Sequence, residues 1–204
     1  MPRPSKNSWQ RTTIGPNCRF ENRSTISRRH QRSDDCRRSG NYTNALSPSK
    51  PVQTELNIGA GSATVRIEEV GLDSLSIIKD LNTAIFGEER IINSLERDDL
   101  MLLVAWVGDE PAGFKVGYRE NRFSFYSAKG GVLHEYRGFG IARLLLDEMV
   151  TLARERGFRR LAYDTFPNMH PGMTVMGLAE GFRVVKADFN TVYRDFRLRF
   201  EKAI

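Results

Sequence analysis

The sequence predicts an α/β (α+β) fold: one domain with a mixed central sheet of about six to seven strands, flanking helices and a basic tail in front. Three observations lead to this prediction. Short apolar runs with the alternation of strands are interspersed with segments whose apolar residues recur at helical spacing. A glycine-containing turn at residues 137–143 joins one such strand to one such helix. The first sixty residues show neither pattern.

Residues 1–60 are predicted to be a disordered basic tail, followed by the domain at residues 61–204. The tail contains 11 Lys and Arg but only 4 Asp and Glu, a net charge of +7, whereas the remainder has a net charge of −1. Its scattered apolar residues cannot bury enough surface to offset the conformational entropy of ordering. Because the basic excess lies in the tail, we expect no nucleic-acid binding by the domain.

The few cysteines and histidines limit the kinds of catalytic and metal site that the domain can have. Both cysteines, Cys18 and Cys36, lie in the predicted tail, which excludes a cysteine nucleophile and a disulfide framework for the domain. The three histidines are too sparse for a zinc site, so we expect no metal. No apolar run approaches the roughly 18 residues of a membrane span. We therefore expect a cytoplasmic protein that does not bind a membrane.

Strands and helices are expected in the order β-α-α-β-β-β-α-β-α-β-β. The expected strands are residues 64–70, 100–107, 112–118, 123–133, 160–166, 184–189 and 192–200. The expected helices are residues 75–85, 88–95, 141–157 and 173–180. The β-α-β rule makes strand 160–166 parallel to strand 123–133. The Gly130-Gly131 pair predicts a bulge that splays these two strands apart and leaves main-chain groups free for a ligand.

The turn at residues 137–143 is a candidate anion site. A helix N-terminus presents unpaired N–H groups and partial positive charge, which suits a pyrophosphate. Gly138 and Gly140 would let a phosphate approach the backbone, and the side chains of Arg137 and Arg143 would add charge-assisted contacts. Arg143 stands where the dinucleotide fingerprint needs its third glycine, and the Lys-Ser/Thr ending of a triphosphate loop is absent. A tight turn without any ligand stays the alternative.

Residues 132–142 resemble the acyl-CoA loop of the GNAT family of N-acetyltransferases. The family signature Arg/Gln-x-x-Gly-x-Gly/Ala is met by Arg137, Gly140 and Ala142, and the order of elements also matches. The resemblance implies a GNAT-like domain with a splayed parallel strand pair and with acetyl-CoA as co-substrate. The cofactor-binding residues that it implies are Gly131, Val132, Arg137, Gly138, Phe139, Gly140, Ile141, Ala142 and Arg143.

The resemblance also implies direct attack of an amine on the thioester, which needs a base and often an acid. Counting back from Gly181-Phe182, the tyrosine acid of the family falls on Gly177. Either water protonates the leaving thiolate, or another tyrosine, Tyr126, Tyr163 or Tyr193, substitutes.

Two side chains are candidate proton acceptors, and with Tyr163 they complete the predicted catalytic set. His170 lies in a Pro-Gly loop and Asp164 lies on the strand beside the expected cleft. A surface or loop-capping role is the alternative for His170, and a buried hydrogen-bonding carboxylate is the alternative for Asp164.

The predicted activity is that of an N-acetyltransferase, an acyltransferase for groups other than amino-acyl groups, acting on a primary amine of a small molecule. One alternative is a protein or peptide N-terminal or lysine acetyltransferase. Another is a non-catalytic CoA-binding regulatory module, which the glycine at the tyrosine position favours. A homodimer is left open.

Overall fold

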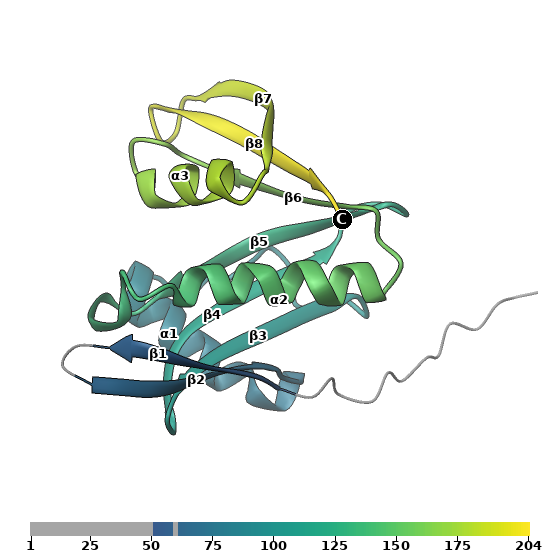
Figure 1. Ribbon diagram of the computed structural model, residues 1–204. Coiled ribbons are helices and arrows are strands. Elements are labelled where there is room, and N and C mark those ends of the chain that lie inside the picture. The colour runs from purple at the N-terminus through teal and green to yellow at the C-terminus, as the bar shows by residue number, and fades with distance from the viewer. Residues whose placement is uncertain (1–50, 59–60) are drawn as a thin grey trace, which may run out of the picture. The chain divides into compact units, whose positions relative to one another are not determined.

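Eight strands form one mixed sheet in the part of the chain that the computed structural model describes, residues 51–58 and 61–204 (Figure 1). The strands are β1 (Val52–Ile58), β2 (Gly61–Glu69), β3 (Leu100–Val107), β4 (Glu110–Arg119), β5 (Ser124–Val132), β6 (Arg160–Thr165), β7 (Arg183–Asn190) and β8 (Asp195–Ala203). The α-helices are α1 (Leu75–Phe86), α2 (Ile141–Glu155) and α3 (Pro171–Ala179), and short 3₁₀ turns lie at Leu72–Ser74 and His134–Tyr136. The strand order is β1-β2-β3-β4-β5-β6-β8-β7.

Helices α1 and α2 cover opposite faces of the sheet, as Figure 1 shows. Successive side chains of a strand point to opposite faces. Leu102 and Val104 of β3 accordingly pack in one cluster with Ile78 of α1. Leu103 and its alternate neighbours pack in a second cluster with Met149 of α2. The apolar stripe of each helix therefore completes one of two cores, and the predicted fold class is confirmed.

The sheet has one strand more than expected, because β1 lies inside the range assigned to the tail. Val52–Ile58 pair antiparallel with β2, and Leu56 and Ile58 pack against the larger core. The boundary predicted at residue 60 therefore differs from the structure, in which the sheet begins at Val52. The rest of the expected tail, including Cys18 and Cys36, lies outside the described residues.

No helix forms at residues 88–95, where a short one was expected. Gly87 ends α1 in the left-handed conformation, with φ +70°, as a helix C-cap. The chain that follows is held by side chains: the Lys129 amino group contacts Glu88 and donates to the Arg90 carbonyl at 2.8 Å. These tertiary bonds replace the helical ones, and they fasten the segment to β5.

The parallel pairing of β5 with β6 is short. It joins Ser124 to Arg160, Phe125 to Leu161 and Tyr126 to Ala162, and then stops. On its other side, β5 continues to pair with β4 as far as Val132. The two strands are therefore splayed beyond Tyr126, as the sequence predicted.

The bulge in β5 lies at Ala128, not at Gly130-Gly131 as expected. Ser127 pairs with Gly117 and Lys129 pairs with Val116, which leaves Ala128 without a partner. Gly130 and Gly131 keep a regular register with Lys115 and Phe114. Close packing leaves no room for a side chain at either glycine. A Cβ on Gly131 would lie 2.9 Å from Ile85 of α1, and one on Gly130 would lie 2.8 Å from the Phe114 carbonyl.

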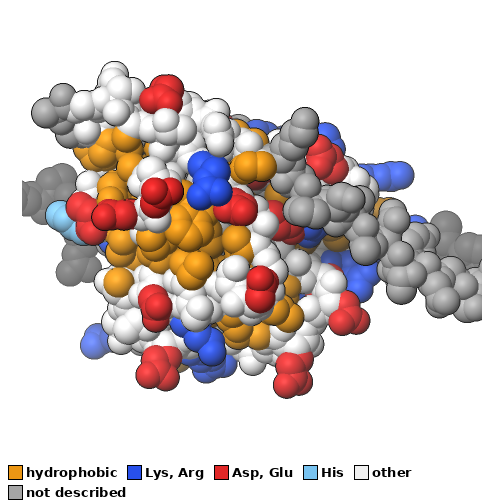
Figure 2. Space-filling view, turned by 90° about the horizontal axis from the view of Figure 1, so that it is seen from below, with side chains coloured by type: hydrophobic (Ala, Val, Ile, Leu, Met, Phe, Trp, Pro, Cys, Tyr) orange, Lys and Arg blue, Asp and Glu red, His pale blue; other side chains and the backbone are white. Residues whose placement is uncertain are grey.

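Acidic and basic side chains are interspersed with hydrophobic surface on the face in Figure 2. Among the described residues, no helix combines the length and the apolar character that crossing a membrane requires.

The Tyr163 side chain of β6 packs against α3 at Gly177. Its ring stacks on Phe200 of β8, with centroids 5.1 Å apart, and its hydroxyl donates to the Met173 carbonyl at 3.4 Å. A Cβ on Gly177 would overlap that hydroxyl. Gly177 thus lets α3 lie against the Tyr163 side chain.

We predict that Gly177→Ala destabilises the protein by about 1–3 kcal/mol through this overlap. The same change in a helix ordinarily stabilises by about 1 kcal/mol. In a Tyr163→Phe background, where the hydroxyl is absent, most of the penalty should disappear, and urea unfolding of the four variants measures the coupling. Equal penalties in both backgrounds would contradict the contact.

Candidate functional site

The loop before α2 has the geometry of an anion cradle. Gly138 and Gly140 have φ values of +84° and +88°, and no atom lies within 4 Å of a Cβ built on either. Within the described residues, no backbone hydrogen bond is donated by the amides of residues 138–142, whereas the amides of Arg143 and Leu144 bond to the Gly140 carbonyl. Free N–H groups therefore gather at the positive end of a fifteen-residue helix.

The arginines at the two ends of the loop hold other elements. The Arg137 Nε atom donates to the Val132 carbonyl at 3.0 Å, which closes the loop onto the end of β5. The Arg143 guanidinium lies 2.6 Å from Glu180, just after α3, and this ion pair links the start of α2 to the end of α3. The backbone supplies the free N–H groups of the cradle, and contacts of these two side chains with a cofactor stay a prediction.

The exposed edge of β5 carries unpaired main-chain groups toward this loop. The Leu133 amide donates to Ala112 of β4 at 2.9 Å. Because main-chain groups of alternate residues share a side in an antiparallel pair, those of Gly131 point to β4 and those of Val132 and Gly130 point away from it. β6 does not pair at this level. The main-chain groups of Gly130 and the Val132 amide are therefore open to a hydrogen-bonding ligand, whereas the Val132 carbonyl accepts from Arg137.

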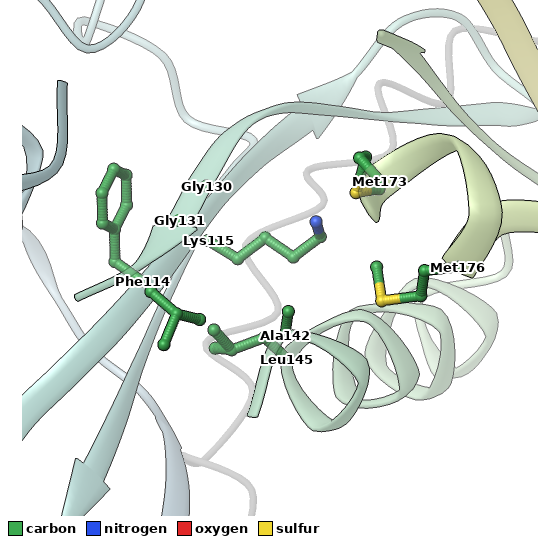
Figure 3. A pocket seen from close by; sticks show the side chains of 9 residues that line it. Phe114, Lys115, Gly130, Gly131, Ala142, Leu145, Met173 and Met176 are labelled. Atoms are coloured by element: carbon green, nitrogen blue, oxygen red, sulfur yellow. The ribbon is translucent and has the colours of Figure 1, made fainter. Parts of the chain in front are cut away.

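A small cavity of about 30 Å³ lies along this edge, between β5, α2 and α3. Nine residues line it: Phe114, Lys115, Gly130, Gly131, Val132, Ala142, Leu145, Met173 and Met176. Figure 3 shows the Lys115 side chain extending from β4 toward Met173 and Met176 of α3, with Ala142 and Leu145 of α2 below it. The predicted cofactor residues Gly131, Val132 and Ala142 are brought together here.

Lys115 also lines this cavity, although it was not among the residues predicted for the site. Only 6% of it is exposed, and its side chain passes over Gly130, where a Cβ would lie 3.1 Å from the lysine Cγ. No hydrogen bond or ion pair of its amino group is found among the described residues. Burial lowers the pKa of the Lys115 ammonium to about 8. A charged residue between Phe114 and Val116, in an apolar strand, was the available signal.

Asp164 lies on the opposite face of β6 from Tyr163. Its carboxylate accepts from the Tyr126 hydroxyl at 3.2 Å and contacts Arg199 at 3.5 Å. Burial, followed by the charge of Asp164, raises the pKa of Tyr126. A groove beside Asp164 is lined by further charged residues of β7 and β8, and these form ion pairs with one another, among them Arg197 with Asp188 at 2.8 Å.

The other two catalytic candidates have different surroundings from those of Asp164. His170 is exposed at the N-cap of α3, where its amide donates to the Phe166 carbonyl at 2.7 Å. Tyr163 is 2% exposed, and burial raises the pKa of its phenol, which makes it a weaker acid. Within residues 51–58 and 61–204, no three His, Cys, Asp or Glu side chains gather as a metal site would require.

We predict that Lys115→Met raises the free energy of unfolding near pH 7 by about 1–3 kcal/mol. The lysine pKa falls from 10.5 to about 8 on folding, so below pH 8 the folded state holds a buried charge. Between these two values the unfolded chain binds more protons, so wild-type stability rises with pH and the advantage of the variant shrinks. Urea unfolding across this pH range measures the effect.

Lys129→Met is the matched control, since the Lys129 amino group is paired with Glu88 and Arg90. It should give no gain near pH 7. A Lys115→Met protein less stable than wild type near pH 7 would contradict the unpaired burial of Lys115.

Residues 89–166 match a family model described as an acetyltransferase (GNAT) domain. This range contains β3 to β6, the loop at residues 137–143 and α2. No curated protein matches the sequence.

Solved structures with the same fold include several acetyltransferases. A GNAT family acetyltransferase from Elizabethkingia anophelis with acetyl-CoA bound has a TM-score of 0.60 at 16% identity, covering 69% of this chain and 98% of its own. The IAA acetyltransferase from Bacillus cereus has a TM-score of 0.60 at 21% identity, with 69% and 99% covered. Arabidopsis thaliana Naa50, in complex with the bisubstrate analogue CoA-Ac-MVNAL, has a TM-score of 0.57 at 21% identity, with 69% and 99% covered. The resemblance found in the sequence is thus confirmed: the chain has the GNAT fold, and its residues 89–166 match the GNAT acetyltransferase domain.

Proposed function

We propose that this protein is an acetyl-CoA-dependent N-acetyltransferase that acts on a primary amine. The observation that carries the proposal is the continuity between the open edge of β5 and the free amides of residues 138–142. A ligand with a hydrogen-bonding arm and a diphosphate fits both at once. The acetyl-CoA bound to the Elizabethkingia anophelis structure supports this choice of ligand.

The residues of the cradle fit acetyl-CoA. The positive φ and open surroundings of Gly138 and Gly140 suit the close approach of phosphate oxygens. The main chain of Gly130 and the amide of Val132 offer hydrogen bonds along the acyl-carrying arm, and Met173 and Met176 offer apolar contact. When bound, acetyl-CoA supplies an acetyl group activated as a thioester.

The proton of the incoming ammonium needs an acceptor on this chain, and Asp164 and His170 are the proposed candidates. Asp164 is fixed by Tyr126 and Arg199 at the splayed end of β6. His170 is exposed at the start of α3, which also lines the cavity with Met173. Tyr163 is the weakest of the predicted set, since its hydroxyl is turned to Met173 and Gly177.

Two classes of acceptor are candidates, a small-molecule amine and a peptide N-terminus. We favour a small-molecule amine. A peptide N-terminus is the second candidate, because the Naa50 structure holds a peptide-containing bisubstrate analogue and another neighbour is the ribosomal-protein-S18-alanine N-acetyltransferase from Escherichia coli. A regulatory CoA-binding module, a homodimer and a cytoplasmic location also stay predictions.

Calorimetry with acetyl-CoA, followed by release of free thiol on a panel of small amines, lysine peptides and peptides with free N-termini, tests the proposal. Thiol release with small amines supports the favoured acceptor, and release only with peptides favours the second candidate. Binding without release on any amine favours the regulatory module. Absence of acetyl-CoA binding would overturn the proposal.

We predict that Gly140→Ala weakens acetyl-CoA binding by at least about tenfold, because a methyl group would hold a phosphate away from the amides. Gly157→Ala at the other end of α2 is the matched control, since Gly157 also has a positive φ, +83°, and open space at its Cβ. Both variants carry a similar backbone strain of about 1–2 kcal/mol. Equal affinities by calorimetry would remove the loop from the binding site.

A further prediction concerns proton transfer. Replacing the true acceptor, by Asp164→Asn or His170→Ala, should lower kcat by about 10²-fold or more, whereas Tyr163→Phe should lower it by less than tenfold. Steady-state kinetics with the best amine of the panel measures these effects. A large loss for Tyr163→Phe, with both other variants active, would reverse the assignment.

A further inference from the structure

Lys115 is the single ionisable side chain among the nine residues that line the cavity. The cavity wall consists of glycine, alanine, valine, leucine, methionine and phenylalanine from β4, β5, α2 and α3. An ammonium group in such a wall is unfavourable unless a partner accepts its hydrogen bonds. The described residues supply none, and the amino nitrogen is not among the fully enclosed polar atoms, so water or an anionic or hydrogen-bond-accepting group of a ligand can be its partner.

The position of Lys115 identifies which part of a ligand it meets. Lys115 and Gly130 are register partners, and the lysine side chain passes over the glycine toward the gap between β5 and β6. The free amide and carbonyl of Gly130 lie on that same side of β5. A thioester arm bonded to this edge would therefore bring its sulfur and carbonyl toward the Lys115 amino group.

Helix α3 brings no acid of its own to this place. Its two residues that line the cavity are Met173 and Met176. At the next residue, Gly177, the Tyr163 hydroxyl occupies the space that a Cβ would take. That hydroxyl donates to Met173 and has a raised pKa. The departing sulfur thus has one proton donor within the cavity wall.

We propose that Lys115 is the catalytic acid that protonates the CoA sulfur as the thioester breaks, an inference that rests on the proposed function. The acceptor amine, already in its neutral form, forms a bond from its nitrogen to the thioester carbonyl carbon, and that nitrogen releases one N–H proton to solvent so that a neutral amide results. The carbon–sulfur bond breaks, and its electron pair stays on sulfur. One proton moves from the Lys115 ammonium to that sulfur, giving CoA thiol, and the neutral lysine regains a proton from solvent.

The acidity of Lys115 suits this transfer. Its pKa of about 8 lies close to the roughly 8.5 of an ordinary thiol, so the proton moves without a large energy difference. No other charged group lines the cavity from β5, α2 or α3 to shift it further. In complexes with the CoA thiol, the ammonium should also favour the thiolate.

The test uses CoA and desulfo-CoA, in which hydrogen replaces the thiol, with the full-length wild type, Lys115→Met and the control Lys129→Met. The thiolate absorbance of bound CoA, followed against pH, gives the thiol pKa, and calorimetry gives both affinities. In wild type and Lys129→Met we expect the thiol pKa to fall by about one unit on binding, and CoA to bind several-fold more tightly than desulfo-CoA. Lys115→Met should bind desulfo-CoA as wild type does and lose both effects.

Each other outcome decides against the inference. An unshifted thiol pKa in wild type, or the same shift in Lys115→Met, would overturn the role of Lys115 and leave the proposed function intact. Failure of wild type to bind either ligand would overturn the proposed function and this inference with it. An acetyl group on Lys115 after incubation with acetyl-CoA, found by peptide mass spectrometry, would make the lysine an acetyl acceptor instead of an acid.

Discussion

The short pairing between β5 and β6 is the constraint on which the site depends. Only three residue pairs join these parallel strands before they diverge. The chain that leaves β5 must cross over through α2 to reach β6, so the open strand edge and the helix N-terminus face the same gap. Main-chain polar groups at such an edge need partners. The sheet therefore creates a place that a hydrogen-bonding ligand completes.

Two glycines shape the walls of this gap, because each lacks a Cβ where another side chain passes. Gly130 leaves space that the Lys115 stem crosses, and Gly177 leaves space that the Tyr163 hydroxyl fills. The second contact closes α3 onto β6 and takes a hydroxyl out of use. The first carries an amino group from β4 across β5 into the cavity. The missing Cβ of Gly177 thus lets α3 pack against β6, and the missing Cβ of Gly130 lets the Lys115 side chain reach the cavity.

The two faces of β6 handle charge in different ways. On one face, Asp164 is held by Tyr126 and Arg199, and the Arg199 guanidinium is also paired with Glu120. On the other face, the cavity wall is apolar except for Lys115. A buried ammonium without a partner lowers stability, and groups that do so in clefts are frequently functional. An apolar side chain of similar length would pack in this wall at a smaller cost.

The sequence by itself determined the features that depend on neighbours along the chain. The glycine turn at residues 137–143, the periodicity of α2 and the parallel β5-α2-β6 unit all follow from local preferences and from the handedness of crossovers. The resemblance of the loop to the GNAT family has the same origin, because it rests on residues that lie close together in the sequence.

Only the tertiary structure decided which distant residues meet. β1 pairs with β2 and extends the sheet into the range expected for the tail. The bulge lies at Ala128, where the register between β5 and β4 shifts. Residues 88–95 form no helix, and the Lys129 amino group bonds to this segment at the Arg90 carbonyl. Lys115 reaches the cavity only because a glycine on the neighbouring strand is its register partner. Strand register and side-chain contact depend on residues far apart in sequence, so local patterns carry too little information to specify them.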